Sequence, residues 1–204
     1  MKVFFKKSSL TIFFLFFLTS LTFADPSKYN KKIDIKWFED QYEEIYKNVK
    51  LESSKPTKEI WISAYTKKFK PEKTRSSAEI YWEHIALRYA DDVQTDINRN
   101  YSDTLVLTSN HGNFYGKKGL ESSARILYSL LPDTAYTIVD TVVQGDWVTE
   151  RWGYYNKKSN KMVIDGIDTF LILNGKIQVK MINYTVVPAD ISYEEYLKIL
   201  GINN

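Results

Sequence analysis

The sequence predicts an α+β domain in which a cone-shaped, curved antiparallel sheet packs on N-terminal helices and leaves a cavity. Three observations support this fold class. The first half of the chain carries apolar residues at helical spacing, the last third alternates as strands do, and another helical stretch lies between strands. The 204 residues, 44% of them hydrophobic, are enough for one well-packed domain with an extension.

The clearest element is a β-hairpin over residues 161–187, with its turn at Asn174-Gly175. Asn-Gly between two apolar runs favours a two-residue turn, because both turn positions need a positive φ. This turn would set Asp168 opposite Met181. The expected inner row is Asp168, Phe170, Ile172, Ile177, Val179, Met181 and Asn183, and the outer row is Asp165, Ile167, Thr169, Leu171, Gln178, Lys180, Ile182 and Tyr184. A shift of one residue would bury Lys180, so we expect a well-defined register.

The other elements follow from periodicity and capping residues. Asp34 can cap a first helix, and Ser76 with Glu79 forms a capping box. Residues 58–70 also alternate like a strand, but we expect a helix there. The expected helices are 34–50, 58–70, 78–100 with a bend near 91–92, 120–131, and a short helix from Ser192 that ends at Gly201; the expected strands are 105–109, 135–144, 146–155 and the hairpin, with a turn at 110–113 and a loop at 116–119.

The N-terminus has the pattern of a signal peptide. Basic residues within 2–7 precede an uncharged apolar run over 8–23. The small residues Thr22 and Ala24 then precede a cleavage point before Asp25. The alternative is an uncleaved anchor, although the run is shorter than the roughly 20 residues of a spanning helix. We expect export to the periplasm or the medium, with no stable membrane insertion after cleavage.

We therefore expect four parts: a signal peptide (1–24), a helical extension (25–75), the main domain (76–188) and a C-terminal helix (189–204). The chain has no cysteine, which excludes disulfides, thiol catalysis and a lipid-modified cysteine. Its net charge of +3, with both signs mixed, is too small to indicate nucleic-acid binding.

Several short motifs follow one another between residues 76 and 187. They are Tyr101-Ser102-Asp103 before a strand, Gly116-Lys117-Lys118-Gly119-Leu120 opening a helix, Leu131-Pro132 closing it, Gly145-Asp146 before a strand with Trp152, and the pieces DGIDTF, LILNGKI and INYTV within 165–186. In this order they resemble the nuclear transport factor 2-like superfamily, which includes SnoaL-like polyketide cyclases and ketosteroid isomerases. The resemblance implies the fold but not the function, because this fold hosts enzymes, binding modules and assembly domains.

One part of the resemblance concerns Asp168. The segment Ile167-Asp168-Thr169-Phe170 resembles the ketosteroid isomerase strand that carries a protonated aspartic acid, which donates a hydrogen bond to the developing enolate. The general-base aspartate of that family would fall near Ser109, and its oxyanion tyrosine near Ile85. Since this chain has neither group there, we do not expect steroid isomerase activity.

Two carboxyl groups are the main catalytic candidates. With Met181 opposite and no Lys or Arg on its row, Asp168 is expected to have a raised pKa and to act as a neutral hydrogen-bond donor. The alternative is a structural carboxyl group bonded to a helix or to Asn183. Glu150 lies on an otherwise apolar row with Trp152, and two carboxyl groups in a dry pocket shift each other's pKa. The alternative is that Glu150 lies at an edge of the sheet and pairs with a lysine.

The remaining candidates are a histidine and the pocket wall. His111, in a turn, could act as a base or could simply be solvated, and we expect His84 to be packed or at the surface. Two distant histidines and no phosphate-binding glycine loop lead us to expect no metal and no cofactor. The expected ligand-binding residues are Trp152, Phe170, Met181, Asn183, Ser109 and Ile85.

Two function classes stay open. One is a cofactor-free acid–base enzyme of the isomerase, cyclase or lyase type acting on a small apolar carbonyl compound. The other is a non-catalytic ligand-binding or dimerisation module. We also expect a homodimer through the outer sheet face, because Ile167, Leu171, Ile182 and Tyr184 make the outer row apolar, unless the N-terminal helix covers that row.

Overall fold

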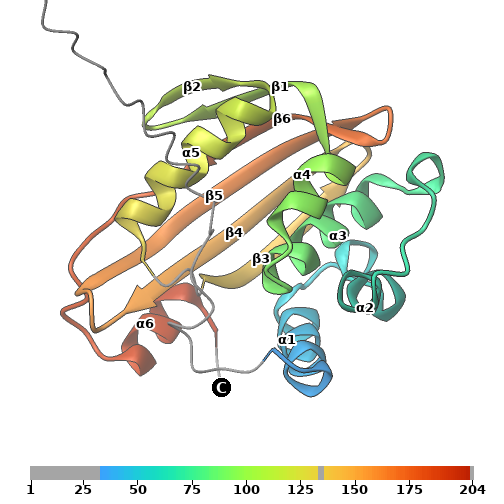
Figure 1. Cartoon of the computed structure of the whole chain (residues 1–204). Coiled ribbons are helices and arrows are strands. Elements are labelled where there is room, and N and C mark those ends of the chain that lie inside the picture. The colour runs from blue at the N-terminus through green and yellow to red at the C-terminus, as the bar shows by residue number, and fades with distance from the viewer. Residues whose placement is uncertain (1–32, 133–135, 203–204) are drawn as a thin grey trace, which may run out of the picture.

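The computed structural model describes residues 33–132 and 136–202 (Figure 1). The helices are α1 (Ile35–Asn48), α2 (Lys58–Thr66), α3 (Ser77–Tyr89), α4 (Val93–Asn100), α5 (Gly116–Leu130) and α6 (Tyr193–Leu200), with 3₁₀ turns η2 (Glu52–Ser54) and η3 (Glu72–Thr74). The strands are β1 (Tyr101–Ser109), β2 (Gly112–Tyr115), β3 (Tyr136–Gln144), β4 (Trp147–Asn156), β5 (Lys161–Leu173) and β6 (Lys176–Asn183). The predicted α+β fold class is confirmed.

The strands form one curved sheet in the order β2-β1-β6-β5-β4-β3, with α3, α4 and α5 on the same side of it (Figure 1). The expectation of an entirely antiparallel sheet was wrong, because β1 pairs with β6 in parallel. The chain between these strands runs through β2, α5 and the other three strands, which is the long crossover that parallel neighbours need. The other strand pairs are antiparallel.

Capping residues set the helix ends largely as predicted. The Asp34 side chain accepts a hydrogen bond from the backbone N–H of Trp37, and Ser76 and Glu79 form the predicted capping box. The predicted bend near 91–92 is a break between α3 and α4, because Asp91 has a φ of 55°. The Asp92 side chain then caps α4 through the backbone N–H of Thr95.

Helix α5 begins at Gly116, so the expected loop over 116–119 was wrong. The two glycines serve close packing in the first turn of the helix instead. A Cβ at Gly116 would lie 2.9 Å from the Asp103 carbonyl oxygen, and one at Gly119 would lie 2.9 Å from the Phe114 backbone. They let α5 start directly against β1 and β2.

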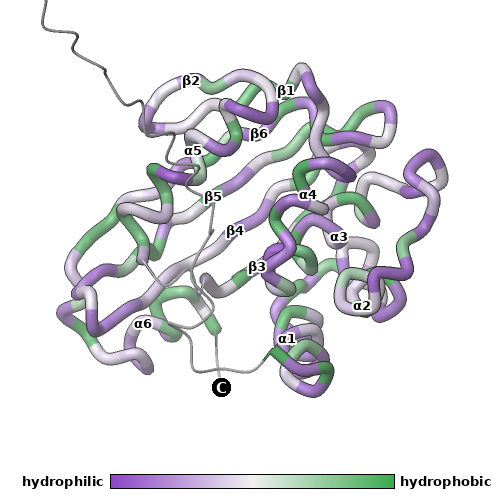
Figure 2. Tube along the Cα trace, viewed as in Figure 1, coloured by the Kyte–Doolittle hydropathy of each residue, from purple (hydrophilic) through white to green (hydrophobic). Residues whose placement is uncertain are grey.

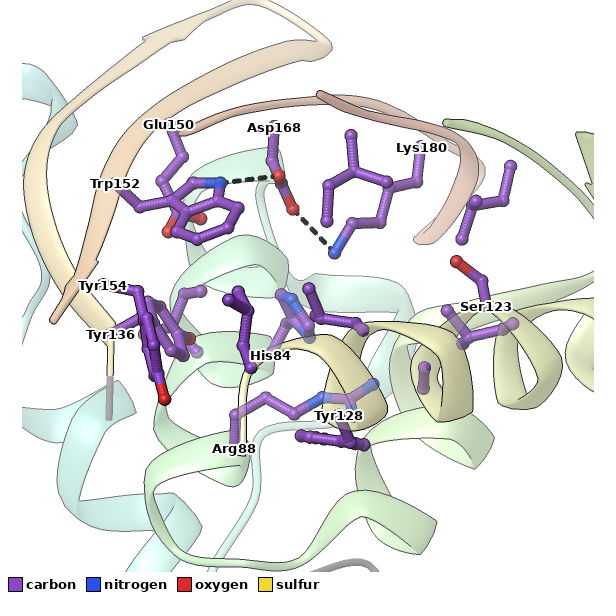
Figure 3. Close-up of a pocket in the computed structure, with 17 residues that line it drawn as sticks. His84, Arg88, Ser123, Tyr128, Tyr136, Glu150, Trp152, Tyr154, Asp168 and Lys180 are labelled. Atoms are coloured by element: carbon purple, nitrogen blue, oxygen red, sulfur yellow. Dashed lines mark hydrogen bonds and ion pairs between the residues drawn. The ribbon is translucent and has the colours of Figure 1, made fainter. Parts of the chain in front are cut away.

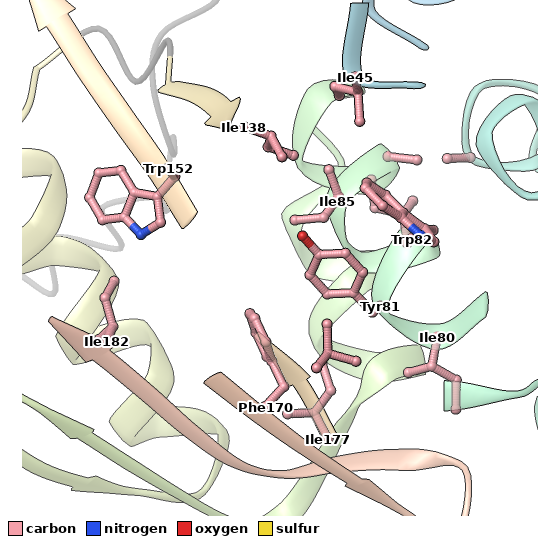
Figure 4. Close-up of a cluster of buried hydrophobic side chains, with 14 of the residues drawn as sticks. Ile45, Ile80, Tyr81, Trp82, Ile85, Ile138, Trp152, Phe170, Ile177 and Ile182 are labelled. Carbon is pink, nitrogen blue, oxygen red and sulfur yellow. The ribbon is translucent and has the colours of Figure 1, made fainter. Parts of the chain in front are cut away.

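The main core lies between α3 and the concave face of the sheet. Figure 4 shows Tyr81 of α3 facing Phe170 and Ile177 of the β5–β6 hairpin. Helices α1 and α2 join this core through Phe38 and Trp61, so the N-terminal extension packs with the main domain. In Figure 2 hydrophobic and hydrophilic stretches both occur along α1, as expected for a helix with one buried face.

The hairpin has the predicted turn but a different register beyond it. Ile172 pairs with Ile177 as expected, but the neighbouring Leu171 pairs with Val179, so Gln178 is an extra residue in β6. Such a β-bulge reverses which side chains face inward further along the strand. The register prediction was therefore wrong beyond residue 178. Lys180 now shares the inner face with Asp168, together with Ile182 and Tyr184, whereas Met181 and Asn183 lie outside.

The predicted signal peptide lies outside the described residues, and its cleavage stays a prediction. None of the helices within 33–132 and 136–202 has the length and apolar character needed to cross a membrane.

Candidate functional site

A cavity of about 140 Å³ lies between the concave face of the sheet, α3 and α5 (Figure 3). Most of its wall is apolar, with a small set of polar and charged groups. Its lining residues are His84, Ile85, Arg88, Leu107, Leu120, Ser123, Ala124, Leu127, Tyr128, Leu131, Tyr136, Glu150, Trp152, Tyr154, Asp168, Lys180 and Ile182. A concave apolar site with a few converging polar groups is typical of small-molecule pockets.

Helix α5 supplies one wall because its apolar residues recur at helical spacing. Leu120, Ala124 and Leu127 line the cavity together with Leu131, which follows the helix. Residues three and four positions apart share one face of a helix.

On the sheet side, a glycine makes room for the indole of Trp152. Gly166 lies directly opposite Trp152 in the β4–β5 pair, and any Cβ at this position would overlap the indole ring. The ring can therefore lie across the backbone of β5. In this position Trp152 Nε1 donates a hydrogen bond to Asp168 Oδ1 at 2.8 Å.

Asp168 also forms an ion pair with Lys180. Lys180 Nζ lies 2.8 Å from Asp168 Oδ2, and the side chains are 13% and 7% exposed. Burial alone would lower the pKa of Lys180, but the nearby Asp168 outweighs burial and raises it. Both oxygens of Asp168 thus accept hydrogen bonds, as an ionised carboxylate does. The expectation that Asp168 is a neutral donor was wrong, because the bulge at Gln178 brings a lysine onto its row.

Glu150, rather than Asp168, is the carboxyl group that is expected to be neutral at pH 7. It lies directly opposite Asp168 in the β4–β5 pair and is 2% exposed. Its Oε2 accepts a hydrogen bond of 3.0 Å from the hydroxyl of Tyr81. Burial, followed by the negative charge of Asp168, raises the pKa of Glu150 to about 8. At pH 7 the cavity therefore contains a protonated acid beside an ion pair.

Helix α3 adds a second charged group on the other side of the cavity. Asp96 of α4 accepts hydrogen bonds from Arg88 Nε at 2.6 Å and lies 2.9 Å from His84 Nδ1. Burial lowers the pKa of His84, so the imidazole is expected to be neutral at pH 7. Asp96 thereby fixes both Arg88 and His84 where they face the cavity.

The cavity brings together Asp168, Glu150, Trp152 and Ile85 from the predicted site and leaves out the others. Phe170 is buried in the core, where its ring lies 5.4 Å from that of Tyr81. Met181 and Asn183 are exposed on the outer face, so the structure does not support their expected position in the pocket wall. The reason in both cases is the bulge in β6.

Ser109 and His111 also lie away from the cavity. They belong to the β1–β2 turn, where the Ser109 hydroxyl accepts a hydrogen bond from the backbone N–H of His111. His111 is exposed and its Nε2 lies 3.1 Å from the Tyr184 hydroxyl. The ring of Tyr184 is 5.6 Å from that of Trp152, so His111 can reach the cavity only through two other side chains.

The sequence did not reveal Lys180, Arg88 or His84 as cavity residues. Lys180 was assigned to the outer face because no local signal marks the bulge. Arg88 and His84 lie on α3, whose residues from Ile80 to Leu87 are all buried, so periodicity could not indicate which side faces the cavity. In the described part of the chain no group of three or more His, Asp or Glu could hold a metal ion, and the predicted absence of a metal stays a prediction.

Comparisons with known proteins give likenesses of structure only. No family model and no curated protein matches the chain. It is similar to a SnoaL-like protein from Mesorhizobium loti, with 17% identity, 53% of this chain and 98% of that chain covered, and a TM-score of 0.39. It is also similar to a nuclear transport factor 2-like protein from Burkholderia xenovorans, with 12% identity, coverage of 61% and 94%, and a TM-score of 0.45. These matches come from the superfamily that the sequence resembles, and at such low similarity they carry no functional information.

Proposed function

We propose that this protein binds a small, mainly apolar molecule with a hydrogen-bond acceptor, such as a carbonyl oxygen, in the cavity between α3, α5 and the sheet. The observation that supports this best is Glu150, which lies buried in an otherwise largely apolar pocket where burial and the charge of Asp168 raise its pKa to about 8. The Tyr81 hydroxyl occupies Oε2 of Glu150, and no described residue forms a hydrogen bond with Oε1. A neutral carboxyl group in this position can donate its proton to a bound acceptor.

The volume of the cavity limits the size of the ligand. At about 140 Å³ it is close to the engineered cavity of about 150 Å³ that takes up benzene. The expected ligand is thus a single six-membered ring or a short chain of similar size.

Binding of benzaldehyde and toluene, measured by calorimetry at pH 7, tests this function. The two molecules have similar size, but only benzaldehyde can accept a hydrogen bond from Glu150. We expect benzaldehyde to bind more tightly than toluene to the wild type and to Glu150→Gln, whose amide still donates. Glu150→Met should bind both equally. A preference for benzaldehyde that survives in Glu150→Met would contradict the role of Glu150.

A second candidate is cofactor-free acid–base catalysis on a carbonyl compound. The observation that favours it is the pKa of Glu150 of about 8, because a group that titrates near neutral pH can transfer protons in both directions. Exchange of the α-hydrogens of cyclohexanone in D₂O, followed by NMR, tests it. Exchange that the wild type accelerates and Glu150→Gln does not would support an enzyme. Equal exchange rates with the wild type and Glu150→Gln would support ligand binding without catalysis.

Export of the protein is also part of the proposal. It rests on the basic and apolar pattern of residues 2–23 and the small residues Thr22 and Ala24. Mass spectrometry of protein secreted from an expressing bacterium should give a mature chain that begins at Asp25. A full-length chain in the membrane fraction would favour the anchor instead.

A homodimer through the outer sheet face is proposed for the same molecule. The bulge in β6 removes Lys180 from this face together with Ile182 and Tyr184, two of the four apolar residues predicted there, and adds Met181 to it. Other large apolar side chains exposed on the sheet strands are Val106, Tyr115, Val142, Trp147, Ile164, Ile167 and Leu173. Large apolar surfaces of this kind are typical of interfaces between proteins.

A further inference from the structure

Arg88 has hydrogen-bonding capacity that the described protein does not use. Its Nε donates to Asp96 Oδ2 at 2.6 Å, and the side chain is only 13% exposed. Neither of its two terminal nitrogens forms a hydrogen bond with any residue in 33–132 or 136–202. Since Arg88 lines the cavity, this end of the guanidinium group is available to a ligand.

Arg75, another buried arginine, provides a comparison within the same fold. Arg75 Nη1 lies 2.7 Å from Glu83 Oε1, and its Nη2 donates to the backbone oxygen of Arg99 at 3.1 Å. Both terminal nitrogens of Arg75 therefore have partners within the protein. The free terminal nitrogens of Arg88 are not a general property of buried arginines in this chain.

The geometry of Arg88 suits a carboxylate. Asp96 holds the guanidinium by its Nε, which leaves the edge formed by the two terminal nitrogens free. This edge can donate two parallel hydrogen bonds to the two oxygens of one carboxylate, the pairing in which arginine is most selective.

The charges around the cavity also permit an anion. Lys180 neutralises Asp168 at 2.8 Å, and Arg88 neutralises Asp96. The cavity-lining carboxyl group of Glu150 forms no ion pair with any described residue, and its Oε2 accepts a hydrogen bond from Tyr81 of α3 (Figure 3). Since the carboxylates of Asp168 and Asp96 already have a cationic partner each, a ligand carboxylate bound at the free edge of Arg88 would not face an unpaired negative charge from either of them.

We propose that the natural ligand is a small monocarboxylate with an apolar body about the size of one six-membered ring, whose carboxylate group binds the terminal nitrogens of Arg88. This inference rests on the proposed binding function and names the class of its ligand. The apolar body would lie against Leu120 and Leu127 of α5 and the indole of Trp152, which line the same cavity. An acceptor at the other end of the ligand would meet Glu150.

Calorimetric titration with sodium benzoate and with benzamide tests the inference. The two probes share ring and size and differ in charge. We expect the wild type to bind benzoate at least tenfold more tightly than benzamide. Arg88→Lys keeps a positive charge for Asp96 but loses the two-pronged donor, and it should lower this preference at least tenfold while the affinity for benzamide changes less than twofold.

Arg125→Lys is the matched control, because Arg125 is an exposed arginine of α5 away from the cavity lining. It should bind benzoate like the wild type. A thermal melt of Arg88→Lys together with its retained benzamide binding shows that the variant is folded. The inference is overturned if the wild type binds benzamide as tightly as benzoate, or if Arg88→Lys keeps the full preference.

The outcome also separates the inference from the proposed function. If benzaldehyde binds in a manner that depends on Glu150 but benzoate does not bind, the carboxylate class is wrong and the binding function stands. If neither benzaldehyde, benzamide nor benzoate binds, both are wrong.

Discussion

Replacing Glu150 with glutamine tests the charge state on which the proposed pocket chemistry depends. Burial and the neighbouring Asp168 raise the pKa of Glu150 from 4.5 to about 8. Between these values the folded protein holds a proton that the unfolded chain releases. The free energy of unfolding must therefore fall as the pH rises. Glu150→Gln removes this titration, and its amide oxygen can still accept the hydrogen bond from Tyr81.

The expected magnitude follows from the shift. A difference of one bound proton changes the free energy of unfolding by about 1.4 kcal/mol per pH unit. For a pKa of about 4.5 in the unfolded chain and about 8 in the fold, the wild type should lose roughly 2.5 kcal/mol relative to Glu150→Gln from pH 5 to pH 7. The stabilising effect of the protonated form is complete below the unfolded pKa and is lost as the pH rises through 8. Other groups, such as His84, titrate in both proteins and cancel.

Urea denaturation followed by circular dichroism at pH 5, 6, 7 and 8 measures this difference. Glu43→Gln is the control, because Glu43 is an exposed residue of α1, and its difference from the wild type should stay within about 0.5 kcal/mol at every pH. If the difference between the wild type and Glu150→Gln does not change with pH, Glu150 is ionised in the folded protein and the donor role is refuted.

Three further predictions concern the strands around the cavity. Asp168→Asn should lower the free energy of unfolding by roughly 3 kcal/mol at pH 7, because it leaves Lys180 buried without a counter-charge. Adding Lys180→Met should recover most of this loss in urea denaturation. No recovery would mean that the ion pair does not form. Gly166→Ala should cost about 1–3 kcal/mol, because the methyl group overlaps the indole of Trp152, and an unchanged thermal melt would contradict this contact. The wild type should be a dimer in light scattering and Met181→Lys a monomer, whereas a monomeric wild type at high concentration would contradict an interface on the outer sheet face.

Much of the fold could be predicted because its signals are local. The Asn174-Gly175 turn, the capping box at Ser76 and the cap at Asp34 each depend on a few neighbouring residues. The apolar spacing of residues 120–131 predicted the helix that supplies one wall of the cavity. The parallel pairing of β1 with β6 could not be predicted in this way, since it joins segments about seventy residues apart and leaves no local pattern.

The site was harder to predict than the fold because one extra residue decides its chemistry. Alternation correctly placed Asp168 and Glu150 on the inner face. The same alternation placed Lys180 outside, since burying a lysine looked unfavourable. The cost is offset by Asp168, whose carboxylate pairs with Lys180 only because Gln178 bulges out of the ladder. The two charges lie on different strands, so the residue pattern of either strand alone does not reveal that they compensate each other.

The bulge at Gln178 also explains why Glu150, rather than Asp168, keeps a proton. With Lys180 outside, the two facing carboxyl groups would have no cation between them, and each would disfavour the charge of the other. With Lys180 inside, Asp168 has a counter-charge and also accepts a hydrogen bond from the indole N–H of Trp152. Glu150 has no counter-charge of its own, so burial raises its pKa. A ligand in the cavity then meets a donor at Glu150 and a free cationic edge at Arg88, while both oxygens of Asp168 are already occupied. The acid that the sequence marked most clearly thus acts by fixing the charge state of its neighbour.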